Sequence, residues 1–213
     1  MSLTAAAIVV DGCSTLLDTS LVSWSLAERI GYLNEAIRAT VFVKPDAYPV
    51  RGVVTPVAGT VQTIPADGVA LIDITHNSGT GRVITQVDAD LLKEADRFWP
   101  RGTQQDEAEH FAVDVRDARR YMLFPPNDGS GSLYMVYGAV PAPLTTSTDA
   151  LPLPDSYQPA LLAYVLSRAY AKNSKRQDLV KAQAYRSEWG ALLGLKSQAQ
   201  VAVAPHVAAS TGM

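Results

Sequence analysis

The stretch LPLPDSYQPALLAYVLSRAYAKNSKRQDLVKAQAYRSEWGALLG, residues 151–194, decides the fold of this chain. Apolar residues recur at helical spacing on both sides of a short polar break, which predicts two amphipathic helices. The first set is Leu161, Leu162, Val165, Leu166, Ala169 and Tyr170, and the second is Leu179, Ala182, Tyr185, Trp189, Leu192 and Leu193. Helices joined by so short a link are expected to lie antiparallel.

The ends of both helices carry recognisable signals. Asp155 with Gln158 three residues later has the pattern of a capping box, which predicts the start of the first helix there. Pro159 then falls in the first turn, where a missing N–H costs least. Asn173-Ser174 is predicted to cap the second helix, and Gly194 is a natural residue to end it.

Charge is unevenly distributed along the chain. Residues 156–213 hold seven basic and two acidic residues, whereas residues 1–155 hold 11 basic and 19 acidic ones. This polarity suits subunits that stack in an assembly, or a basic face near nucleic acid. A solvated helix face is an equal alternative for any single residue. The sequence pI of about 5.6 argues against a protein whose whole surface grips DNA.

Composition bounds the remaining classes. The 213 residues can bury one good core or two small ones, and Cys13, the only cysteine, excludes an internal disulfide. The longest apolar run, Ala5–Val10, is too short to span a membrane. No Lys or Arg precedes Asp11, as a secretory signal would require. We therefore expect a reducing cytoplasm, or a particle assembled there.

The N-terminal 49 residues predict two helices. Ser2 or Thr4 would cap the first, with Ile8, Val9, Leu16 and Leu17 facing inward and Gly12 weakening its continuity. Ser25 to Glu28 forms a capping box for the second, which should end before Pro45.

Residues 50–140 predict a β-rich module of about six strands. Its β-rich runs are Val53-Val54, Val61–Ile64, Val69–Thr75, Arg82–Val87, His110–Val115, Tyr121–Phe124 and Ser132–Tyr137. A short helix is expected over Asp88–Arg97, with Asp88 as its cap. Asn77–Gly81 and Asn127–Gly131 are expected to be exposed loop tips, since Asn and Gly favour turns.

The fold class that follows is α+β: a helical bundle from the N- and C-terminal segments, with an inserted, sandwich-like β module. We expect helices in 1–49, the β module in 50–140, a return linker and the helical hairpin in 141–194, and an extended arm in 195–213. The arm is nearly uncharged and has no helical or strand period.

No pattern for catalysis, a cofactor or a metal is evident, so we expect no enzyme and no cofactor. Asp73 with His76 is conceivable as a dyad, but a surface hydrogen bond is the better interpretation. Asp106, Glu107, Glu109 and His110 form an acidic cluster for which a solvated loop is favoured over a cation site. Gly79-Thr80-Gly81 and Gly129-Ser130-Gly131 are hairpin glycines and no phosphate cradle.

Several segments, in order along the chain, resemble a family of bacteriophage head-to-tail adaptor (connector) proteins from short-tailed phages. The C-terminal ones are Leu153–Leu161 and Tyr164–Tyr170, and the others are Tyr32–Ala36, Lys44–Ala47, Gln62–Gly68, Leu133–Tyr137 and Pro141–Pro143. The resemblance implies a structural virion protein at the head–tail junction. It implies about a dozen copies in a ring, bound to the portal and a tail nozzle or tube protein, with DNA passing through unread.

The residues expected at interfaces are aromatic or basic residues of the helical segments and valines of the arm. They are Trp24, Tyr157, Arg168, Tyr170, Lys175, Arg176, Trp189, Val201, Val203 and Val207. The alternative function is a β-sandwich module of a phage tail that contacts polysaccharide or another tail protein. A hydrolase built on Asp73 and His76 is a weaker third hypothesis.

Overall fold

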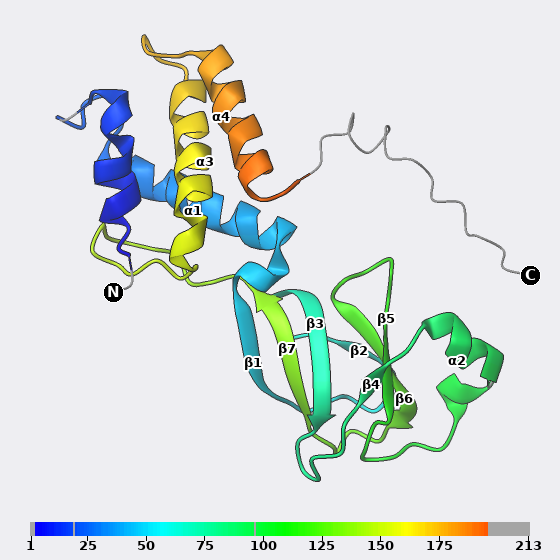
Figure 1. Cartoon of the computed structure of the whole chain (residues 1–213). Helices are drawn as coiled ribbons and strands as arrows, with labels where there is room; N and C mark the ends of the chain where they lie inside the picture. The colour runs from blue at the N-terminus through cyan, green and yellow to red at the C-terminus, as the bar shows by residue number, and fades with distance from the viewer. Residues whose placement is uncertain (1–2, 19, 96, 196–213) are drawn as a thin grey trace, which may run out of the picture. The chain divides into compact units, whose positions relative to one another are not determined.

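Figure 1 shows the computed structural model of the chain, which describes residues 3–18, 20–95 and 97–195. The described chain divides into two compact units. The helical unit combines the N-terminal residues up to Ala36 with the residues from Leu144 onward, and the β unit is Ile37–Pro143. Helices and two β-sheets are both present, so the predicted α+β class is confirmed.

The N-terminal segment of the helical unit is irregular. A π-helical turn, η1 (Ala7–Asp11), is followed by a 3-10 helix, η2 (Gly12–Leu16), so the first predicted helix is not a regular α-helix and changes form at Gly12, where its continuity was expected to be weak. Gly12 marks the change because a Cβ there would lie 3.0 Å from Leu162 and 3.1 Å from the Ala7 carbonyl oxygen. The close approach of the later helix therefore demands glycine at this position.

Helix α1 (Leu26–Val43) begins and ends as predicted. The Glu28 backbone N–H donates to Ser25 Oγ at 3.3 Å, which is half of a capping box. The Glu28 carboxylate also accepts from Tyr32 and Lys172. The helix therefore uses its N-terminal acid for tertiary contacts.

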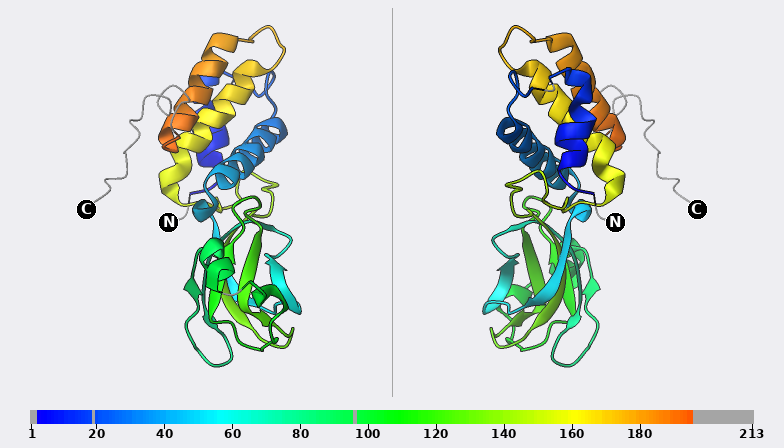
Figure 2. Two further views of the ribbon diagram at one scale, coloured as in Figure 1. Left: turned by 90° about the vertical axis from the view of Figure 1, so that its right-hand side faces the viewer. Right: turned by 90° about the vertical axis from the view of Figure 1, so that its left-hand side faces the viewer.

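The C-terminal hairpin consists of α3 (Gln158–Ala171) and α4 (Leu179–Leu192), which lie side by side in both views of Figure 2. Two of its predicted caps are wrong. Asp155 lies in a 3-10 turn, η5 (Asp155–Tyr157), and α3 has no side-chain cap. Asp178, and not Asn173-Ser174, caps α4, because its carboxylate accepts the Lys181 N–H at 3.0 Å. Gly194 ends the hairpin at φ +72°, as expected.

Helix α4 buries one narrow face. Ala182, Trp189 and Leu193 are buried, whereas Leu179 and Leu192, which were expected to face inward, are 64% and 50% exposed. A helix at the edge of a small bundle has only one neighbour to pack against, so part of its apolar pattern stays in solvent.

Trp189→Ala is expected to destabilise the helical unit by about 3 kcal/mol, because the ring is buried against Tyr164 at a centroid distance of 5.5 Å. Chemical denaturation followed by circular dichroism measures this change. A wild-type melting temperature in the variant would show that Trp189 does not hold α4 in place.

The β unit contains seven strands in its described residues. They are β1 (Pro49–Val54), β2 (Gly59–Thr63), β3 (Gly68–Asn77), β4 (Thr85–Gln86), β5 (His110–Val113), β6 (Arg120–Asn127) and β7 (Leu133–Ala139). Short helices η3 (Pro45–Ala47), α2 (Ala89–Ala95) and η4 (Trp99–Arg101) complete it. One sheet has the order β1-β7-β3 and the other β2-β6-β5-β4.

The main core of the β unit lies between its two sheets. It takes Ile74 from β3 and Met135 from β7 on one side, and Phe111 from β5 and Leu123 from β6 on the other, all of them fully buried. Most pairings are antiparallel, whereas β4 runs parallel to β5. This arrangement agrees with the sandwich-like module expected from the alternating runs.

Three local predictions in the β unit are wrong. The run Arg82–Val87 forms only the two-residue β4 and an isolated bridge at Val83. The strand expected over Tyr121–Phe124 extends to Asn127, the first residue of an expected loop tip. Asn77 and Asn127, expected at exposed tips, are 3% and 0% exposed.

The buried asparagines replace missing backbone partners. Asn77 donates to the Ala108 carbonyl at 2.7 Å and accepts the Ala108 N–H at 2.9 Å. Asn127 donates to the Asp106 carbonyl at 3.0 Å. A primary amide has both an N–H donor and a carbonyl acceptor, as a peptide group does. These side chains can therefore hydrogen-bond to the backbone of a loop in place of a neighbouring strand.

Candidate interaction surfaces

The hairpin of the helical unit presents a surface on which basic side chains cover aromatic rings. The Arg186 guanidinium lies 4.6 Å from the Tyr164 ring centroid and 4.4 Å from that of Trp189. Lys181 lies 5.3 Å from the Tyr170 ring, which stacks on Tyr185 at 5.8 Å. Each contact keeps a positive charge near the surface while shielding an apolar ring.

A groove of about 430 Å³ runs between α3 and α4, and we call it the hairpin groove. Its lining includes the small residues Ala171, which is exposed, and Ala182, which is buried, together with the exposed side chains of Arg168, Arg186 and Leu179. The groove is therefore both positively charged and partly apolar.

Polar contacts link the hairpin to α1 and fix two of its bases. Lys172 Nζ lies 2.8 Å from Glu28, and Arg168 Nε lies 2.8 Å from Glu35. Burial acts to raise the pKa of Glu28, but hydrogen bonds from Lys172 and Tyr32 outweigh it and lower that pKa. Burial and the bond to Glu28 raise the pKa of Tyr32 to about 12.

The sequence-predicted interface residues have different environments. Trp24 is 1% exposed and donates its indole N–H to the Ala169 carbonyl at 3.0 Å, so it belongs to the core of the helical unit. Arg176 is exposed and donates to the Leu16 carbonyl at 3.1 Å, beside the Trp24 ring. Lys175 is exposed, and Tyr157 and Tyr170 are half-buried. Val201, Val203 and Val207 lie outside the described residues.

A second surface of the helical unit was not foreseen from the sequence. Leu17 and Leu21 adopt left-handed backbone conformations, with φ values of 51° and 54°. Leu17, predicted to face inward, is instead 81% exposed. Both leucines line an apolar pocket of about 410 Å³ with Val10 and Leu26. Left-handed backbone is costly for leucine, so the surrounding structure must hold this loop in place.

The buried Asp18 holds that loop. Its carboxylate accepts the backbone N–H groups of Val22, Ser23 and Trp24 at 3.1, 3.0 and 2.9 Å. Arg29 lies 3.5 Å away, and both side chains are 4% exposed. Desolvation acts to raise the pKa of Asp18, but the three N–H donors and the charge of Arg29 lower it below its usual value. A lone Asp in a polar stretch was the only sequence signal for this arrangement.

The thiol of Cys13, which lies in η2, is free and buried. Burial raises the pKa of its thiol to about 11. The thiolate is therefore scarce at neutral pH.

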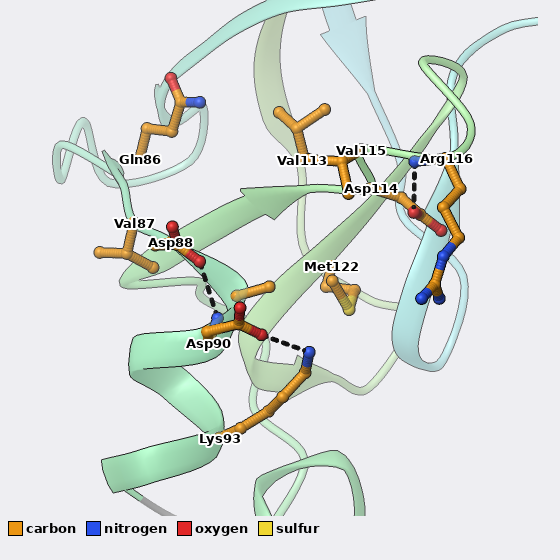
Figure 3. Close-up of a pocket in the computed structure, with 11 residues that line it drawn as sticks. Gln86, Val87, Asp88, Asp90, Lys93, Val113, Asp114, Val115, Arg116 and Met122 are labelled. Carbon is orange, nitrogen blue, oxygen red and sulfur yellow. Dashed lines mark hydrogen bonds and ion pairs between the residues drawn. The ribbon is translucent and has the colours of Figure 1, made fainter. Parts of the chain in front are cut away.

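The β unit has a pocket of about 540 Å³ lined by residues of β4, α2, β5 and β6, shown in Figure 3. Its charged groups are engaged locally. The Asp88 carboxylate accepts the Asp90 N–H at 2.8 Å, and the Asp90 carboxylate lies 2.7 Å from Lys93 Nζ. Asp114 accepts the Arg116 N–H at 2.9 Å. These carboxylates stabilise a helix start and a turn, which explains their positions without a substrate.

The residues considered as catalytic or metal-binding groups have other partners in the structure. The His76 ring pairs with the Thr75 hydroxyl at 2.8 Å and stacks on Tyr134, so it is not oriented by Asp73. Glu107 of the acidic cluster pairs with Arg82 at 2.7 Å. No group of three or more metal-binding side chains occurs among the described residues. In the same part of the chain, no helix is long and apolar enough to cross a membrane.

Comparison with known families shows which family the chain belongs to. A family model described as SU10 adaptor protein matches residues 3–209, nearly the whole chain. The chain belongs to the SU10 adaptor protein family. The match covers both units, and it confirms the resemblance noted from the sequence segments. A search of curated proteins gave no match.

Membership of the SU10 adaptor family fixes the general role. An adaptor of this family is a structural phage protein, which makes the chain a virion component that contacts other head or tail proteins. We therefore interpret the surfaces described above as candidate sites of contact with other proteins.

Proposed function

We propose that this SU10 adaptor family member forms the adaptor ring that joins the portal to the tail of a short-tailed phage. About a dozen copies would surround the channel through which DNA passes without sequence-specific contacts. The family match over residues 3–209 is the observation that carries this proposal. The ring function requires large subunit contacts and no reaction centre.

The surfaces of the helical unit support the proposal. The hairpin groove and the apolar pocket beside Leu17 and Leu21 together expose leucines and arginines on one small unit. Exposed apolar side chains beside arginine are typical of the centres of protein interfaces. Of the residues first considered, we assign contact roles to Arg168, Tyr170, Lys175 and Arg176, and to Tyr157 at the start of α3.

The C-terminal residues 195–213 complete the proposal as a portal-binding arm. The segment is nearly uncharged and carries Val201, Val203 and Val207 among many alanines. Small apolar side chains suit a strap in a groove of a partner, with affinity from added backbone hydrogen bonds.

Deletion of residues 197–213 tests the arm. We expect the truncated chain to keep its wild-type melting temperature, because the deletion starts beyond α4, and to bind purified portal rings at least about tenfold more weakly. Co-sedimentation or interferometry with portal rings measures the affinity. Wild-type affinity in the truncated chain would show that the arm is not the portal contact.

The mass of the assembled chain tests the ring. Native mass spectrometry of the chain with portal rings should give about a dozen copies per portal. A single copy, or binding to polysaccharide on a glycan array in place of the portal, would support the alternative of a tail binding module.

A further inference from the structure

The hairpin groove is a positively charged surface, and the described residues of the chain leave one of its bases without a carboxylate partner. Three bases of the hairpin pair with carboxylates: Arg168 with Glu35, Lys172 with Glu28, and Lys181 with Asp178. Arg186 has no carboxylate within 4 Å among the described residues, and its guanidinium rests on two aromatic rings at the groove wall. The adjoining Leu179 is 64% exposed.

The β unit carries a helix with the complementary properties. Helix α2 exposes Leu91, which is 61% accessible, and the exposed acids Asp88, Asp90 and Glu94 surround it. Asp90 pairs with Lys93, whereas Glu94 has no basic partner within 4 Å among the described residues. Leu91 and Glu94 are three residues apart on a helix, so they share one face.

We infer that α2 of one copy docks into the hairpin groove of a second copy. Leu91 would pack on Leu179 and on the alanines that line the groove, and Glu94 would pair with Arg186. This inference rests on the proposed ring, for which it names the two contacting surfaces. The contact joins different surfaces of two identical chains, and repetition of such a contact closes into a ring when the rotation allows it.

The charges of the two contacting segments also support this contact. Among residues 158–192, six bases oppose two acids, whereas the segment 88–94 has three acids and one base. Both segments also expose leucines, which solvated charged faces do not require. Opposite charge around an apolar contact sets partner orientation and suppresses like-with-like pairing.

A charge exchange tests the contact. Arg186→Glu and Glu94→Arg, each alone, should weaken self-association by about tenfold or more in sedimentation velocity, and the double variant should recover most of the wild-type affinity. Arg51→Glu in β1 and Glu109→Lys, which change exposed charges outside the groove and α2, are matched controls and should leave self-association unchanged.

Leu91→Lys and Leu179→Glu form a second pair that does not disturb the Arg186 ring contacts. Both side chains are exposed, so folding should persist, and each variant should weaken self-association to a similar extent. Recovery in the double variant is expected, since the new charges are opposite. Raised salt should also weaken the wild-type contact.

The outcomes separate this contact from the ring itself. Wild-type chains that remain monomeric at all concentrations and on portal rings would overturn both proposals. Wild-type assembly that none of the four substitutions weakens would overturn the α2 contact alone. Assembly lost on deletion of residues 197–213 but not in the charge variants would assign the self-contact to the C-terminal segment, and would also overturn the α2 contact.

Discussion

Trp24→Ala is expected to destabilise the helical unit by roughly 4–5 kcal/mol, near the upper end for a buried aromatic residue. The Trp24 side chain is among the largest fully buried ones, so its truncation leaves a large cavity in the helical unit. The substitution also removes the indole N–H that donates to the Ala169 carbonyl oxygen at 3.0 Å, and so leaves that oxygen without this donor. Urea unfolding followed by far-ultraviolet circular dichroism measures the change.

Trp24→Phe is the control that separates packing from hydrogen bonding. Phenylalanine keeps most of the apolar contact but no N–H donor, so a loss of about 1–3 kcal/mol is expected. If the alanine variant were no less stable than the phenylalanine variant, the cavity argument would be wrong.

Arg29→Met is expected to cost roughly 3–5 kcal/mol, because it leaves a buried carboxylate without its countercharge. Arg29 is 3% exposed and also donates to the Val9 and Asp18 carbonyl oxygens at 3.1 and 3.0 Å. Methionine fills similar space and removes all three interactions. Arg29→Lys, which keeps the charge but not the planar fork, should be intermediate.

The pH dependence of the same variant gives a second readout. The pKa of Asp18 is lowered in the folded protein, so its stabilising contribution is present above the ordinary pKa of about 3.9. That contribution is lost as the pH falls through the lower folded pKa. The stability difference between wild type and Arg29→Met should therefore shrink below about pH 4, since protonated Asp18 needs no countercharge. A constant difference from pH 7 to pH 2 would contradict the pairing.

The sequence alone was sufficient for elements whose signals are local. Ser25 to Glu28 and Pro45 bounded α1, Gly194 ended α4, and Asp88 capped α2 as predicted. Every β-rich run contains a strand, because alternation reports which face of a sheet is buried. The family resemblance was also visible in ordered segments of sequence before the whole-chain match was known.

Predictions failed where a residue's partner is distant in sequence. Asn77 and Asn127 have the local pattern of turn tips, yet both are buried because they pair with the loop residues Ala108 and Asp106. Asp155 has the pattern of a cap, but its carboxylate accepts from the Leu3 N–H at 3.5 Å. Propensity describes what a segment does alone, and these side chains instead serve backbone groups that other segments leave unsatisfied.

The sequence by itself determined the α+β class, the presence and order of most elements and the charge polarity of the chain, because each depends on neighbours within about one helical turn or strand. Only the tertiary structure decided which apolar residues belong to the core. Trp24 and Trp189 are buried, whereas Leu179 and Leu192 of α4 are exposed. It also decided that Leu17 faces outward over the buried Asp18–Arg29 pair. Burial is a property of how segments pack, and helical or strand periodicity cannot encode which of two apolar faces finds a partner.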